Sequence, residues 1–99
     1  MNIRINAVKF AADQKLEKFV ENKVKKLIQL NDDIIGAEVF LKLENAQDMT
    51  NKVAEIRIEL PGNELFAKKQ SKSFEESTDN AIDALKRQIK RHKDKVRGV

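Results

Sequence analysis

Two hydrophobic periods alternate along the chain, a period of two that is typical of strands and a period of three to four that is typical of helices. Apolar and polar residues alternate over residues 2–8, which predicts a half-buried strand. From Asp13 to about Leu30 the spacing predicts a helix with one apolar face, and Asp13 is placed to accept from the free amides at its start. That face comprises Leu16, Phe19, Val20, Val24, Leu27 and Ile28.

Three further strands follow within the next forty residues of the chain. Residues 35–44 alternate most clearly, and residues 45–51 form a polar loop. Residues 54–60 alternate again until Pro61-Gly62 predicts a turn, and residues 64–69 predict a shorter strand whose lysines suit an edge. The alternation directs these side chains to a core: Ile35, Ala37, Val39, Leu41, Leu43, Ala54, Ile56, Ile58, Leu60, Leu65 and Ala67.

A second helix is predicted from Ser73 to near Arg97, because Ser73 and Glu76 have the Ser-x-x-Glu spacing of a reciprocal cap. Its apolar stripe is Phe74, Thr78, Ala81, Ile82, Leu85, Ile89, His92 and Val96. The order β-α-β-β-β-α predicts an α+β fold with a four-stranded mixed sheet and both helices on one face. The first two strands should be parallel through a right-handed crossover, and the others antiparallel through short turns.

Composition excludes several classes of site. The 99 residues suffice for one domain, 1–99, and contain no cysteine, a single histidine and three glycines. We therefore expect no thiol nucleophile, no zinc site and no phosphate loop, hence no enzyme, cofactor or small-molecule substrate. The first twenty residues carry six charges without an apolar run, so we expect no signal peptide, no membrane span and a cytoplasmic protein.

Positive charge is concentrated near the carboxyl end. Residues 1–67 have a net charge of −1, whereas residues 68–99 have +5. The segment from Lys86 to Arg97 holds seven cations and one acid, Asp94. Such a concentration favours a polyanionic partner, with nucleic acid ahead of a membrane surface.

Helical spacing sorts these cations into a ridge. Lys86, Lys90, Lys93 and Arg97 follow at i, i+4, i+7 and i+11, and Arg87 and Arg91 lie beside them. A row of cations on a rigid helix can replace counterions along a phosphate backbone. The alternative is a solvated helix end that complements the helix dipole, but a dipole needs one or two cations. Nucleic-acid contact is therefore the favoured interpretation.

Lys23 and Lys26 lie three apart on the first predicted helix. They extend the ridge if the two helices lie side by side on the sheet. Ordinary solvation of a helix face is an equal alternative, since Glu17 and Glu21 dilute the field there.

Two outward-facing aromatics, Phe40 and Phe66, raise the question of base stacking on the open sheet face. The charges of that face balance, with Glu38, Glu44, Glu55 and Glu59 against Arg4, Lys42, Arg57 and Lys68. Because a balanced face does not attract phosphates, we expect the two rings to pack against each other across strands.

Candidate acid–base residues have plainer interpretations. His92 follows the apolar stripe, which favours a partly buried imidazole at the margin of the core over a catalytic base. Asp79 and Asp83 are four apart on the second helix, and Asp83 is placed to interact with Lys86 and Arg87. We therefore interpret the two aspartates as helix-surface residues.

The chain resembles the short form of the ribosome hibernation-promoting factor family, also called ribosomal subunit interface proteins. The resemblance spans nearly the whole chain. Its carriers are NIRINAVKF at 2–10, Phe19-Val20 with Lys23, Lys26 and Leu27, VFLKLE at 39–44 and, most specifically, DALKRQIKRHKDK at 83–95.

The resemblance implies a fold similar to double-stranded-RNA-binding domains and a role without catalysis. It implies docking near the decoding region of the small ribosomal subunit, where the protein occludes messenger and transfer RNA and inhibits translation in slow growth or stress. The rRNA-binding residues carried over by the resemblance are Lys23, Lys26, Lys86, Arg87, Lys90, Arg91 and Lys93.

Two departures from the family pattern limit what carries over. Glu75 stands where members often have an aromatic near the start of the last helix, so a stacking role there is lost or moves to Phe74. The chain stops at Val99, without the C-terminal extension by which long-form members pair ribosomes. Pairing would then need a separate partner.

Two other functions remain open from the residues alone. A general double-stranded RNA- or DNA-binding module of similar fold would bind free duplex as well as ribosomal subunits. A protein-interaction module would instead place the basic helix against an acidic partner, and nuclease treatment would leave its complex intact.

Overall fold

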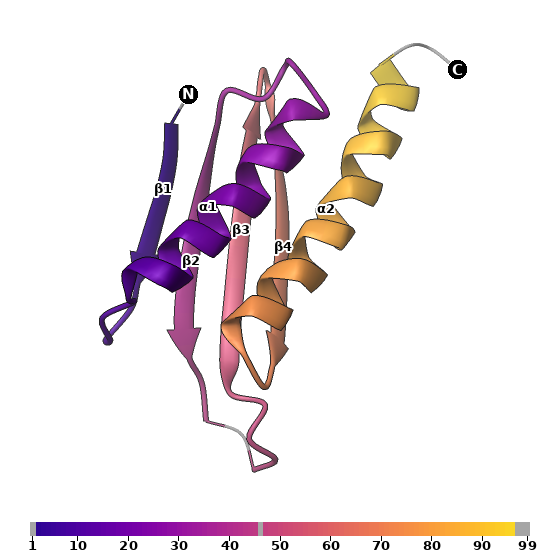
Figure 1. Cartoon of the computed structure of the whole chain (residues 1–99). Helices are drawn as coiled ribbons and strands as arrows, with labels where there is room; N and C mark the ends of the chain where they lie inside the picture. The colour runs from indigo at the N-terminus through magenta and orange to yellow at the C-terminus, as the bar shows by residue number, and fades with distance from the viewer. Residues whose placement is uncertain (1, 46, 97–99) are drawn as a thin grey trace.

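A computed structural model describes residues 2–45 and 47–96 of the chain. Its six elements follow the expected order (Figure 1). They are β1 (Asn2–Ala7), α1 (Gln14–Gln29), β2 (Gly36–Leu43), β3 (Lys52–Leu60), β4 (Asn63–Ser71) and α2 (Phe74–Val96). The expected α+β class is confirmed.

The four strands form one mixed sheet in the order β1-β2-β3-β4. β1 pairs parallel with β2, with Ile3 opposite Ala37, while β2 and β3, and β3 and β4, pair antiparallel. Both helices lie on the same face of this sheet and run in the same direction (Figure 1). Their carboxyl ends therefore lie at the same end of the molecule, which is the feature that positions the candidate site.

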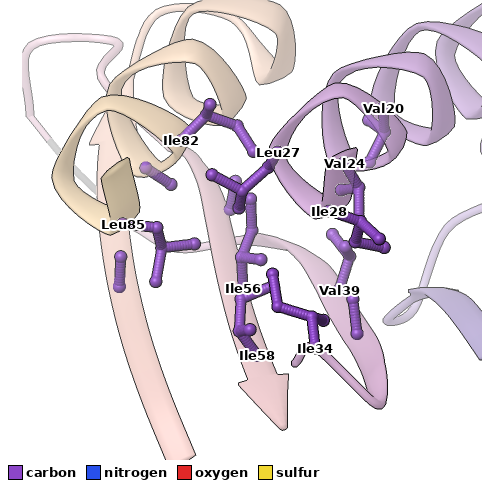
Figure 2. Packing of buried hydrophobic residues seen from close by; sticks show 14 of the residues in the cluster. Val20, Val24, Leu27, Ile28, Ile34, Val39, Ile56, Ile58, Ile82 and Leu85 are labelled. Carbon is purple, nitrogen blue, oxygen red and sulfur yellow. The ribbon is translucent and has the colours of Figure 1, made fainter. Parts of the chain in front are cut away.

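The core lies between the two helices and the sheet. α1 contributes Val20, Val24, Leu27 and Ile28, and Figure 2 shows them packed toward the residues of β2, β3 and α2. Leu27 and Leu85 are both completely buried. This packing fixes the two helices relative to each other, since each one covers apolar side chains of the sheet.

Each helix begins at a capping side chain. Asp13 accepts from the amide of Leu16 at 2.8 Å, as expected. Ser73 accepts from the amide of Glu76 at 3.1 Å, but its own amide donates to Ser71 Oγ at 3.4 Å. The expected reciprocal cap is thus half formed, because a neighbouring hydroxyl serves the amide expected to bond with Glu76.

The burial predicted from the sequence pattern is wrong at the two ends of β2. Ile35 and Leu43 are 51% and 50% exposed, although the alternation assigned both to the core. Ile34, just before the strand, is buried instead at 4% exposed. Ile35 precedes β2, and Leu43 is its last paired residue, opposite Lys52. Their exposure shows that the helices leave both ends of this strand uncovered.

Strands β3 and β4 are longer than predicted. β3 starts at Lys52 rather than Ala54, and β4 runs from Asn63 to Ser71 rather than over residues 64–69. The polar ends of the two strands support each other, because Lys52 lies opposite Ser71. Backbone pairing therefore extends both strands beyond the apolar pattern. β4 lies at the edge of the sheet, as expected.

Candidate nucleic-acid interface

The last turns of α2 gather five cations without an intervening acid. Lys86, Arg87, Lys90 and Arg91 are exposed and Lys93 is partly buried. We call these five residues the basic end of α2. A rise of about 1.5 Å per residue places Lys86 and Lys93 roughly 10 Å apart along the axis. The sequence also assigned Arg97 and Val96 to this helix, but Arg97 and the side chain of Val96 lie outside the described residues.

Ion pairing distinguishes the open sheet face from the basic end of α2. On the open sheet face, Lys42 lies 2.5 Å from Glu55, Arg57 lies 2.6 Å from Glu64, and Lys68 lies 3.3 Å from Glu44. Among residues 2–45 and 47–93, whose side chains the structure describes, the basic end of α2 forms no ion pair with a carboxylate. The cations of the open sheet face are therefore balanced by neighbouring carboxylates, whereas those of the basic end of α2 are not balanced by any carboxylate of residues 2–45 and 47–93.

This arrangement costs the isolated helix some stability. Lys86 and Lys90 are four residues apart, as are Arg87 and Arg91, and like charges at that spacing each destabilise a helix by about 0.2–0.5 kcal/mol. The negative end of the helix dipole offsets part of that cost. The last turns of α2 therefore carry cations whose mutual repulsion the helix dipole offsets only in part.

Lys93 has a second role within the fold. Its Nζ donates to the backbone carbonyl of Leu30 at 2.6 Å. Leu30 caps the carboxyl end of α1, where the dipole is negative. Lys93 therefore ties the end of α2 to the end of α1 and holds the basic end of α2 in a fixed orientation.

The two helices lie side by side, which is the condition set for Lys23 and Lys26 (Figure 1). A groove of about 420 Å³ separates them and is lined by Lys23, Lys26, Asp79, Ile82, Asp83 and Lys86. Lys26 is exposed, whereas Lys23 pairs with Asp79 at 3.1 Å. The structure thus brings both lysines to the groove and leaves them in different electrostatic settings.

Asp83 does not pair as predicted. Among the described residues it has no ion pair with Lys86 or Arg87, and Asp79 instead pairs with Lys23 of α1. Packing of α1 against α2 brings the Lys23 ammonium to 3.1 Å from Asp79, whereas helical spacing alone brings no cation of α2 within ion-pair distance of Asp83 in the described residues. His92 is partly buried, as expected, and its Nδ1 lies 3.4 Å from Asn63 Nδ2.

The expected packing of Phe40 against Phe66 is wrong. Phe40 lies on β2 and Phe66 on β4, and β3 separates them, with Glu55 opposite Phe40 and Arg57 opposite Phe66. Phe66 remains 45% exposed. The ion pairs of this face satisfy its charges internally, so it offers phosphates no excess of cations.

Phe74 is not available for base stacking, contrary to the expectation attached to Glu75. Its ring stacks on that of Phe10, with centroids 5.0 Å apart and an interplanar angle of 6°. Phe74 is also buried, at 8% exposed. Its aromatic surface belongs to the packing between the start of α2 and the segment after β1.

The part of the chain that the structure describes contains neither a candidate metal site nor a candidate membrane-spanning helix. No three side chains of the types that bind metals come together there. Neither of the two described helices is long and apolar enough to cross a membrane.

The family model "Sigma 54 modulation protein / S30EA ribosomal protein" matches residues 3–97. The chain belongs to this family. A family relative, the "Ribosome hibernation promoting factor" of Salmonella typhimurium, is 29% identical over 97 residues, which are 98% of this chain and 98% of the relative. The resemblance found in the sequence is thereby confirmed.

Solved structures agree with this family fold. A ribosomal subunit interface protein from Coxiella burnetii matches with a TM-score of 0.84 at 18% identity, over 95% of this chain and 99% of that one. The N-terminal domain of Thermus thermophilus Protein Y matches with a TM-score of 0.78 at 27% identity, over 93% and 99%. The first match supports the fold alone.

Proposed function

We propose that this protein is a ribosome hibernation factor that binds the small ribosomal subunit and inhibits translation. It acts near the decoding region and occludes messenger and transfer RNA in slow growth or stress. Membership of the S30EA family and the name of its Salmonella relative support this role. The observation that carries it is the basic end of α2, where five cations follow within eight residues of one helix and form no ion pair with a carboxylate of residues 2–45 and 47–93.

In this proposal the protein works by occupying space, without catalysis, cofactor or metal. Lys86, Arg87, Lys90 and Arg91 approach rRNA phosphates and release their counterions, and Lys26 adds a cation from α1. Lys93 contributes charge while it holds α2 against α1. Because the core orders the helices before binding, little conformational entropy is lost on docking. Ribosome binding places the protein in the cytoplasm.

The proposal predicts a strong dependence of affinity on salt. Each phosphate contact contributes about 0.7–0.9 to the slope of log affinity against log salt concentration. A variant with Lys86→Gln, Lys90→Gln and Arg91→Gln should lower the slope for purified small subunits by about 2–3. The matched control is Lys15→Gln, Lys18→Gln and Lys72→Gln, which removes three exposed cations, two from the first turns of α1 and one just before α2. Both helices begin at the end of the molecule opposite their carboxyl ends (Figure 1).

The control should keep the wild-type slope and the wild-type urea midpoint. The α2 variant should raise the midpoint slightly, because it removes both like-charge pairs of the helix. Equal slopes for wild type and the α2 variant would contradict the proposal. A translation assay then tests occlusion, because the wild-type protein should compete with messenger and transfer RNA for the subunit. Binding to a free RNA duplex as tight as binding to subunits would favour a general duplex-binding module instead.

A further inference from the structure

The α2 wall of the groove between α1 and α2 changes from cationic to acidic along its length. Lys86 begins the basic end of α2, but the preceding turns of the same helix carry Asp79 and Asp83. Lys23 and Lys26 line the opposite wall on α1. An anion that follows α2 from its carboxyl end therefore meets cations first and carboxylates next.

Two contacts with other residues of the chain hold the Lys23 side chain at the surface of the groove. Its Nζ lies 3.1 Å from Asp79 Oδ1 and 5.4 Å from the centroid of the Phe19 ring. The side chains of Lys23 and Asp79 are 36% and 47% exposed, so solvent and a phosphate can reach the pair. An ion pair this exposed contributes little to stability and can exchange its anion.

We propose that Asp79 is a specificity-determining residue that withholds Lys23 from the RNA. The inference rests on the proposed function and deepens it. With Asp79 present, a phosphate that approaches Lys23 must displace one carboxylate and pass near another. The RNA footprint therefore ends at Lys26, although Lys23 lines the same groove. Removing the charge of Asp79 frees the Lys23 ammonium to bind one further phosphate.

A double-mutant cycle tests this inference. Wild type, Lys23→Gln, Asp79→Asn and the double variant are compared by the salt slope of binding to purified small subunits and to heparin, a linear sulfated polyanion. Asp79→Asn should steepen the slope by about 0.7–0.9, equivalent to a roughly threefold larger change in affinity between 50 and 200 mM salt. In the Lys23→Gln background the same substitution should leave the slope unchanged.

Asp83→Asn is the matched control, because Asp83 lines the same groove and has no ion pair with a lysine of residues 2–45 and 47–93. It removes one negative charge and should raise affinity without steepening the slope. Equal slopes for Asp79→Asn and Asp83→Asn, or a steeper slope that persists with Lys23→Gln, would overturn the inference. If the wild type fails to bind subunits, the proposed function falls, and the heparin measurements still decide whether Asp79 withholds Lys23.

Discussion

Two neighbouring residues of α2 should respond to mutation with opposite signs. Ser77 and Thr78 are both completely buried. Ser77 Oγ donates to the carbonyl of Lys52 at 2.6 Å and lies 2.7 Å from Ser71 Oγ, which joins α2 to β3 and β4. Thr78 Oγ1 has no hydrogen-bond partner among the described residues. The two side chains are thus equally buried, and they differ in whether the hydroxyl group has a hydrogen-bond partner.

The magnitudes follow from these contacts. Ser77→Ala removes the hydrogen bond to the Lys52 carbonyl, of about 1 kcal/mol, and a contact with Ser71 Oγ, which also donates to the Ser73 carbonyl. It regains about 0.5 kcal/mol of helix propensity, for a net loss of about 1 kcal/mol. Thr78→Val keeps the shape and removes a buried hydroxyl whose desolvation costs about 1–3 kcal/mol. Valine has no hydroxyl to desolvate on folding, so Thr78→Val should raise the free energy of unfolding by about 1 kcal/mol.

Equilibrium urea unfolding at 25 °C measures both changes against the wild type. Thermal unfolding gives a second readout, because 1 kcal/mol shifts the Tm of a domain of this size by about 4–8 °C. Ser77→Ala should lower the Tm and Thr78→Val should raise it. Similar destabilisation by the two substitutions would refute the reasoning, since it would mean that Thr78 also makes a buried hydrogen bond.

Three further predictions concern the loops and the open face. Hydrogen bonds from the side chain and amide of Thr50 lower the pKa of Asp48, so Thr50→Val should raise that pKa toward its ordinary value in an NMR titration. Because the folded pKa is the lower one, Asp48 contributes stability above its ordinary pKa and loses it as pH falls through the folded value. Gly62 has φ +70° with nothing within 4 Å of an added Cβ, so Gly62→Ala should cost about 1 kcal/mol in urea unfolding, from backbone strain alone. Phe66→Ala should leave the affinity for small subunits within about twofold of the wild-type value. A tenfold loss would instead indicate that the open sheet face takes part in binding.

The sequence pattern predicts elements well where each one has a local signal. Asp13 marks the start of α1, and the alternation around Val39 and Ile56 places β2 and β3 with the correct face inward. It fails where a contact depends on another element. Burial of Ile34 in place of Ile35 depends on how the chain enters the sheet, which alternation alone does not encode.

The candidate site likewise has one part that a local pattern predicts and one part that depends on contacts between elements. The basic end of α2 follows from helical spacing alone, because all five cations belong to one helix. The pair between Lys23 and Asp79 joins residues on different helices, and no local pattern predicts it. The same holds for Lys93, whose contact with the Leu30 carbonyl joins the ends of two helices. These long-range contacts determine which cations are already engaged within the protein.

Directed cleavage of rRNA tests the central claim most directly. The chain has no cysteine, so a single Lys90→Cys substitution carries one iron–EDTA group that cleaves nearby RNA. Met49→Cys, on the exposed loop at the opposite end of the molecule, is the matched control (Figure 1). The account predicts strong cleavage of small-subunit rRNA around the decoding region from position 90 and a different set of cuts from position 49. Absence of cleavage from position 90, or the same cuts from both positions, would contradict it.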